Sequence, residues 1–282
     1  MKYLCTLADK NYLKQGLALL KSLKDTSNSF TVYFLCLDTY TFQALQGIDN
    51  VIPIKLDELE NSNSEILKYK SHKRYNEYCW SLASSFSKFL LETKSIDHIL
   101  YIDADIYFYQ SLDIIYDELN DKSIGIIRHR HNSASSPDGE FNVGIIYFKN
   151  DKAGLECVQW WNNAILNNTH PHLATCGDQK YLEEFIPMFG KSVCILDSTF
   201  AHGAPWNFRL YVYDSFLEDG TVTWGDKSQL LVFNHFSKFK ILDDGSIDPT
   251  SGQYKDHTLN FQIFNIPEVR GMYVNYAKEI QL

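Results

Sequence analysis

Short apolar runs alternate along this chain with segments whose apolar residues recur at helical spacing. The runs predict strands at 2–7, 31–37, 51–54, 98–103, 123–128, 143–149, 193–197 and 230–234. The helical patterns lie at 11–24, 40–46, 78–94, 153–168 and 177–185. Such alternation is typical of a sheet whose strands are joined by crossover helices, and it predicts an α/β fold.

Three other segments carry weaker patterns. Residues 57–65 are polar and read as a loop or linker. Residues 128–140 read as a loop, and its first residues Arg128, His129, Arg130 and His131 are most simply a solvated edge, with contact to a substrate as the alternative. We expect one domain over 1–240 and an irregular extension over 241–282 that packs on it, ending in a helix that docks on the body or on a partner.

Composition narrows the class of protein. A chain of 282 residues that is 45% hydrophobic and 15% aromatic forms an ordered globular core. Its formal charge of -9 disfavours nucleic acid as a partner, because that affinity comes largely from Lys and Arg on phosphates.

The six cysteines lack zinc-site spacing, and no signal peptide or run of 18 apolar residues occurs. We therefore expect a cytoplasmic protein, either soluble or peripheral at the inner face of the membrane.

Two carboxylates interrupt the most apolar segment, ILYIDADIYF at 99–108. The Asp103-Ala104-Asp105 spacing is weak evidence by itself, because a chain of this composition contains about two such pairs by chance. The pair, however, follows an apolar strand, at whose carboxyl end ligands bind in open α/β sheets. Either a divalent cation with oxygen ligands, Mg²⁺ or Mn²⁺, compensates the two charges, or Asp103 caps a turn and Asp105 is solvated.

A second apolar strand also ends in polar residues. In QLLVFNHFSKFK at 229–240, His235 follows the apolar run, and Lys238 and Lys240 come next. Two strand ends bearing Asp-x-Asp and His can supply two oxygens and one nitrogen to an octahedral cation, and Lys238 can then steady a phosphate as a point charge. The alternative is that His235, a lone His after a strand, has only a structural role.

Several motifs in this order resemble the nucleotide-diphospho-sugar transferases of the GT-A fold, a Rossmann-like mixed sheet flanked by helices. They are TLADKNYLKQGLALLKSL near the start, ILYIDADIYF, FNVGIIYFKN at 141–150, CGDQKYLEEF at 176–185, APWNF at 204–208 and LVFNHFSKFK. The chain is most similar to the family 8 retaining glycosyltransferases, which include glycogenin and bacterial lipopolysaccharide glycosyltransferases. The resemblance covers residues 1 to about 240.

The resemblance implies roles for individual residues. Asp103, Asp105 and His235 are implied as the ligands of a bound Mn²⁺ or Mg²⁺ ion. Nucleotide or donor contacts are implied for Asp9, Asn11, Tyr12, Lys88, Asp103, Ala104, Asn142 and Lys238. Asp178 and Gln179 are implied as the catalytic pair beside the transferred sugar.

Two positions depart from the family pattern. The basic residue beside the donor is commonly Arg, and here Lys88 offers a point charge instead of a bidentate fork. The family usually continues from the metal histidine as His-x-x-Gly-x-x-Lys-Pro-Trp, whereas here the diphosphate lysine stays open between Lys238 and Lys240.

The expected function is a metal-dependent transfer of a sugar, with retention, from a nucleotide-diphospho-sugar such as a UDP-sugar to a glycan or glycolipid of the cell surface. Retention leaves open a covalent intermediate or same-face attack. Trp206 and Asn207 are the acceptor-site candidates, Trp206 because sugars stack on aromatic rings. Two alternatives remain, a sugar-phosphate nucleotidyltransferase of related fold and a non-catalytic nucleotide-sugar-binding module.

Overall fold

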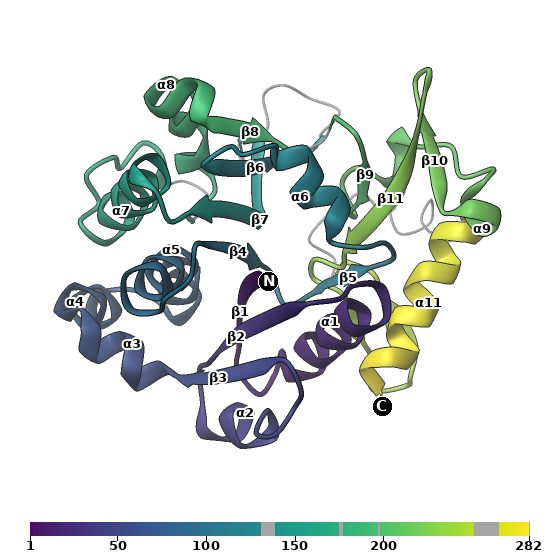
Figure 1. Cartoon of the computed structure of the whole chain (residues 1–282). Coiled ribbons are helices and arrows are strands. Elements are labelled where there is room, and N and C mark those ends of the chain that lie inside the picture. The colour runs from purple at the N-terminus through teal and green to yellow at the C-terminus, as the bar shows by residue number, and fades with distance from the viewer. Residues whose placement is uncertain (131–138, 175–176, 197, 251–264, 282) are drawn as a thin grey trace.

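A computed structural model describes residues 1–130, 139–174, 177–196, 198–250 and 265–281 of the chain. Its centre is a seven-stranded mixed sheet (Figure 1). In spatial order the strands are β3 (Val51–Lys55), β2 (Phe30–Cys36), β1 (Lys2–Ala8), β4 (His98–Ile102), β7 (Phe141–Lys149), β6 (Ile124–Arg128) and β8 (Val193–Ile195). The mixed character comes from β7, which runs antiparallel to both β4 and β6, while the other neighbours are parallel.

Helices cover both faces of this sheet, which is why β4 is buried along its whole length (Figure 1). One face carries α3 (Leu56–Ser62), α4 (Ser64–His72), α5 (Tyr75–Thr93), α7 (Lys152–Leu166) and α8 (Phe185–Phe189), with the 3₁₀ turns η2 (Lys180–Glu184) and η3 (Gly190–Ser192). The other face carries α1 (Leu13–Thr26), α2 (Thr39–Ala44) and α6 (Asp113–Leu119).

A second, smaller sheet stands beside the first (Figure 1). It contains β10 (Thr221–Trp224), β11 (Lys227–His235) and β5 (Ile106–Phe108), and β9 (Ala201–Gly203) pairs with β11. Around it lie η4 (Phe208–Leu210), α9 (Phe216–Asp219), the hairpin β12 (Lys240–Ile241) with β13 (Ile247–Asp248), and α11 (Pro267–Gln281). Because β5 follows β4 after a short turn, the two sheets meet at the Asp103-Ala104-Asp105 segment.

The predicted strands and helices are present, with two corrections. Residues 57–65 are not a loop: they belong to α3 and α4, which meet at Asn63. Tertiary packing overrides the polar sequence there, because Leu59 and Ile66 are buried and Glu60 accepts a 2.5 Å hydrogen bond from Tyr78 on α5. The helix expected at 177–185 is a 3₁₀ turn that runs into α8.

Some expectations fall where the structure gives no description. Most of the expected loop at 128–140 lies outside the described residues, which omit 131–138. Among the described residues, no helix has both the length and the hydropathy needed to cross a bilayer. The division into residues 1–240 and an extension stays a prediction.

The C-terminal helix α11 docks on the body of the protein. Its Tyr273 and Tyr276 pack on Phe236, and the Tyr276 ring stacks on Phe236 with centroids 3.8 Å apart and planes 7° from parallel. Ala18 of α1 belongs to the same apolar cluster. The residue that follows His235 in the chain is therefore held in place by α11.

We expect Tyr276→Ala to destabilise the protein by about 3 kcal/mol, since the buried ring leaves a cavity. Tyr276→Phe is the matched control. It keeps the stacked ring and removes a buried hydroxyl that has no hydrogen-bond partner among the described residues, so stability should stay within about 1 kcal/mol. Denaturant unfolding measures both. Equal losses in the two variants would contradict the stacking role of Tyr276.

Candidate active site

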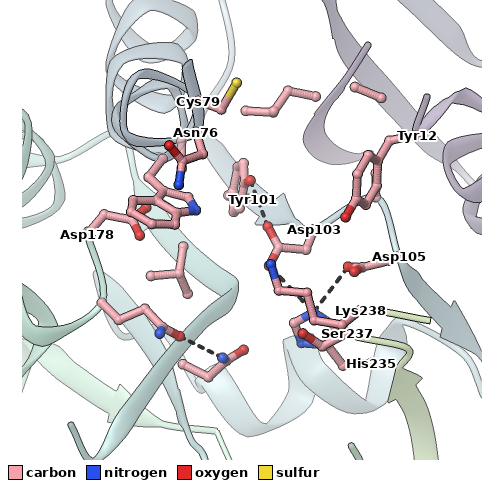
Figure 2. A pocket seen from close by; sticks show the side chains of 18 of the residues that line it. Tyr12, Asn76, Cys79, Tyr101, Asp103, Asp105, Asp178, His235, Ser237 and Lys238 are labelled. Carbon is pink, nitrogen blue, oxygen red and sulfur yellow. Dashed lines mark hydrogen bonds and ion pairs between the residues drawn. The ribbon is translucent and has the colours of Figure 1, made fainter. Parts of the chain in front are cut away.

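A cavity of about 760 Å³ opens where the two sheets meet (Figure 2). Its walls come from the carboxyl end of β1, the turn after β4, the start of β7, the first half of α5 and the segment after β11. Most of the residues singled out from the sequence line it: Asp9, Asn11, Tyr12, Asp103, Ala104, Asp105, Asn142, Asp178, Gln179, Trp206, His235 and Lys238. Residues distant in the sequence therefore converge on one site.

Strand pairing brings the histidine to the carboxylates. β11 runs antiparallel to β5 with His235 opposite Ile106, so the end of β11 lies beside Asp105. The backbone N–H of Phe236 donates to the carbonyl of Asp105 at 2.9 Å and fixes this register. The side chain of His235 then lies with Nε2 at 3.1 Å from Asp105 Oδ1 and 3.7 Å from Asp103 Oδ2 (Figure 2).

These three side chains form a candidate metal centre. Their ligand atoms all lie within 4.8 Å of one another. Two carboxylate oxygens and one imidazole nitrogen suit Mn²⁺ or Mg²⁺, and the remaining octahedral positions suit phosphate oxygens or water. The donor set therefore fits the divalent cation that the sequence predicted, and the alternative in which Asp105 is solvated is wrong, because only 14% of its side chain is exposed.

Neighbouring groups hold the two aspartates. The hydroxyl of Tyr101 donates to Asp103 Oδ1 at 2.8 Å, and the backbone N–H of Asp103 donates to the carbonyl of Gly144 on β7 at 2.9 Å. Burial raises the pKa of Asp105, but the charge and hydrogen bond of His235, a backbone hydrogen bond and the charge of Lys238 together outweigh burial, so the pKa falls below the usual 3.8. For His235, burial lowers the pKa, but Asp105 and Asp103 together raise it more, so without a cation the imidazole holds its proton to higher pH. A cation and this proton therefore compete for His235.

The nucleotide-site candidates surround the turn between β1 and α1. Asp9 accepts from the backbone N–H groups of Asn11 and Tyr12 at 2.9 and 3.2 Å, and from the hydroxyl of Tyr75 at 3.3 Å. Burial and three aspartates, at 105, 103 and 9, raise the pKa of Tyr12 to about 12, so its hydroxyl stays a hydrogen-bond donor. Figure 2 shows Tyr12 above Asp105 on one side of the cavity.

Asp178 lies on the opposite side of the cavity (Figure 2). Burial and the nearby charge of Asp103 raise its pKa well above 3.8, which favours the neutral acid. Next to it, Gln179 Oε1 accepts from Asn142 Nδ2 at 2.8 Å. Asp178, Gln179 and Asn142 thus form one wall of the cavity.

Two of the predicted contacts do not reach the cavity. Lys88 does not line it: nine positions along α5 from Cys79, at about 100° per residue, it points to the other side of the helix. There its ammonium group lies 2.8 Å from Glu92. Asn207 is fully buried and caps its own loop, accepting from the backbone N–H of Ala204 at 2.8 Å. No acceptor can touch it there.

The structure also places the two candidate diphosphate lysines and Trp206, the candidate acceptor residue. Lys238 lines the cavity, whereas Lys240 is an exposed residue of β12 outside it. Trp206 also lines the cavity, with its ring edge-on to His129 and to His235 at 5.4 Å in each case. Its Nε1 donates to the carbonyl of His129 at 2.9 Å.

Several cavity residues were missed from the sequence. α5 contributes Tyr75, Asn76, Cys79 and Trp80, and the other walls add Tyr101 and Ser237. His129, for which the sequence left contact with a substrate as the alternative, also lines the cavity. A solvated edge is wrong for His129 and Arg130, which are 3% and 6% exposed. The Arg130 guanidinium donates to Tyr211 and lies over Trp224, 4.3 Å from the ring centroid. The sequence did contain a signal for the α5 wall, because Tyr75 and Cys79, and likewise Asn76 and Trp80, are four residues apart and so share one side of a helix.

Comparison with known proteins identifies the family. The profile of Glycosyl transferase family 8 matches residues 4–215. The chain belongs to this family. As a family 8 member it is a glycosyltransferase, which is the enzyme class predicted from the sequence. This membership excludes the alternative of a sugar-phosphate nucleotidyltransferase.

Its relatives extend over most of the chain. The uncharacterized protein YfnF of Bacillus subtilis (strain 168) is 28% identical over 260 residues, 86% of this chain and 83% of the relative. The galactosyltransferase LgtC, solved with donor and acceptor sugar analogues, aligns with a TM-score of 0.56 at 17% identity over 83% of this chain and 86% of LgtC. Mouse xyloside xylosyltransferase 1 aligns with a TM-score of 0.53 at 13% identity, over 83% and 97%. These likenesses confirm the GT-A fold.

Gly144 gives a test of the site in this family 8 enzyme. A Cβ at this position would lie 2.5 Å from Asn142 Oδ1 and 2.9 Å from His235 Nδ1, so Gly144→Ala must displace the imidazole. We expect the Mn²⁺-dependent rise in melting temperature to fall by at least half. Gly271→Ala is the control, because a Cβ there meets nothing within 4 Å. An unchanged Mn²⁺ response in Gly144→Ala would show that His235 does not ligate the cation.

Proposed function

We propose that the protein is a metal-dependent, retaining glycosyltransferase that moves a sugar from a UDP-sugar or another nucleotide-diphospho-sugar to a glycan or glycolipid. The observation that supports this most is the convergence of Asp103, Asp105 and His235, with ligand atoms within 4.8 Å, in the same cavity as Lys238. A cation held by these three residues, together with the ammonium group of Lys238, would place positive charge where a diphosphate leaving group develops negative charge.

The first part of the proposal is the cation. Asp103, Asp105 and His235 would hold Mn²⁺ or Mg²⁺, which when bound supplies positive charge to the diphosphate oxygens. Lys238 adds a single ammonium charge from the segment that follows β11. Without such compensation, the carboxylates of Asp9, Asp103, Asp105 and Asp178 would make this cavity repel a polyanionic donor.

The second part is the orientation of the donor. We assign the nucleoside to the end of the cavity at Asp9, Asn11 and Tyr12, where backbone and side-chain polar groups surround the β1–α1 turn. The diphosphate then reaches Asp105 and Lys238. The sugar points towards Asp178, which lies on the opposite side of the cavity in Figure 2, and towards its neighbour Gln179, which also lines the cavity.

The third part concerns the transferred sugar. A neutral Asp178 carboxyl group can donate a hydrogen bond to a sugar hydroxyl, and it is a weaker nucleophile than a carboxylate. Its raised pKa therefore favours sugar binding over a covalent intermediate on this residue. In same-face attack the acceptor oxygen bonds to the anomeric carbon as the bond to phosphate breaks, and a phosphate oxygen takes the acceptor proton.

The fourth part is the acceptor. The half-buried ring of Trp206, edge-on to His235, offers an apolar surface beside the reacting end of the donor. Retention and a cell-surface glycan or glycolipid as acceptor are proposed from kinship with family 8. Action at the inner face of the membrane is proposed from the cysteine usage, which suits a reducing compartment.

Nucleotide binding tests the metal centre. We expect UDP to raise the melting temperature only when Mn²⁺ or Mg²⁺ is present, and Asp105→Ala to abolish this rise because it removes a ligand from the set of three. Asp49→Asn is the control, since this exposed residue lies outside the cavity. A UDP-induced rise of full size in Asp105→Ala would contradict the assignment of Asp105 as a metal ligand. Thermal-shift measurements with a panel of nucleoside diphosphates also identify the base.

A matched pair of lysines tests the leaving-group contact. We expect Lys238→Met to lower kcat for donor turnover about tenfold to a hundredfold, because the ammonium charge stabilises the departing diphosphate. Lys240→Met should leave kcat within about twofold, since Lys240 lies outside the cavity. Steady-state release of the nucleoside diphosphate measures both. The opposite order would assign the role to Lys240.

A further inference from the structure

The side-chain amide of Asn142 has only one orientation that its neighbours allow. Asn142 is 7% exposed, and its Oδ1 accepts from the backbone N–H of Gly144 at 2.8 Å. A backbone N–H can only donate, so the oxygen of Asn142 must face Gly144 and the NH₂ group must face away. Both hydrogens of that NH₂ group are directed at other residues of the cavity wall.

One of these hydrogens points at His129. Nδ1 of His129 lies 3.1 Å from the carbonyl oxygen of Gly139, which can only accept, so Nδ1 carries the proton. Nε2 lies 3.1 Å from Asn142 Nδ2, which donates, so Nε2 must be the unprotonated nitrogen. The backbone groups of Gly139 and Gly144 together fix His129 as the neutral Nδ1–H tautomer.

The second hydrogen of Asn142 Nδ2 is donated to Gln179 Oε1 at 2.8 Å. The Gln179 oxygen therefore faces Asn142 and the wall. Its NH₂ group is left for the cavity that Gln179 lines. The chain of contacts from Gly139 through His129 and Asn142 thus determines which end of the Gln179 amide a substrate meets.

We infer that His129 is a positioning residue that acts through Asn142 to hold Gln179 as a hydrogen-bond donor to the transferred sugar. This inference rests on the proposed function for its substrate. Gln179 then contributes an N–H to a sugar oxygen and does not attack the anomeric carbon through its own oxygen. Asn142, expected from the sequence to face the sugar, uses its amide to orient Gln179.

Two substitutions of His129 separate this role from a merely structural one. In His129→Gln the amide oxygen can occupy the place of Nε2 and accept from Asn142, whereas the contact with Gly139 is lost. In His129→Asn the amide nitrogen can replace Nδ1 and keep Gly139, whereas Asn142 loses its acceptor. We expect His129→Asn to lower kcat for donor turnover about tenfold with little change in the KM of the donor, and His129→Gln to restore most of it. The reverse order would overturn the inference.

Gln179→Glu tests the polarity of the amide directly. A carboxylate still accepts from Asn142 but offers the sugar no N–H, so kcat should fall about tenfold or more. Full activity would overturn the inference.

A readout that needs no turnover separates the two proposals. Long-range ¹H–¹⁵N spectra of histidine-labelled protein, assigned with His129→Gln, should show the Nδ1–H tautomer of His129 at neutral pH. An Nε2–H or doubly protonated ring would overturn the inference whatever the activity. A wild-type protein that shows this tautomer but neither binds nor turns over any nucleotide sugar with Mn²⁺ would overturn the proposed function alone.

Discussion

The pairing of β5 with β11 is the contact on which the site depends. It sets His235 opposite Ile106 and one residue from Asp105, although the two strands lie far apart in the sequence. A slip of one residue in this register would turn the imidazole to the other face of the small sheet. The candidate metal centre is therefore a product of strand register, and the hydrogen bond from Phe236 N–H to the Asp105 carbonyl supports it as much as the three candidate ligands do.

The cavity brings buried negative charges close to positive ones, and each would be unfavourable if it were buried alone. Four aspartates line it, and near two of them the imidazole of His235 and the ammonium of Lys238 offset part of the repulsion. This arrangement holds together without a cation because Asp105 and His235 form a close pair. An ion bound by the proposed metal centre would have to displace a proton from His235, which would tie its binding to pH.

The sequence predicted the fold, and it predicted that Asp103, Asp105 and His235 lie together, because both leave local signals. Apolar runs marked the strands, and polar residues directly after 98–103 and 230–234 marked the edge where ligands bind. Failures came where the answer depended on packing. Lys88 has a plausible motif position, but the phase of α5 turns it away from the cavity. Asn207 sits in a suggestive motif, but its amide is used up in capping its loop.

His129 illustrates the same limit for a residue that was undervalued. A run of Arg and His residues reads as solvated, because nothing in the sequence indicates that a carbonyl at Gly139 and an amide at Asn142 will enclose the ring. The polar α3–α4 segment was misjudged for the same reason, since its buried side comes from contacts with α5. Hydrogen bonds between distant residues are invisible to periodicity and composition.

The stacking of Tyr276 on Phe236 has a consequence for the order in which the enzyme becomes competent. During translation the central sheet can form around the two aspartates while α11 is still unmade. Phe236, at the end of β11, is packed by Tyr276 only after α11 has emerged from the ribosome and docked. A ribosome-bound chain would thus carry its carboxylates in place before its imidazole is held firmly, so the three candidate ligands would come together only at the last stage of maturation.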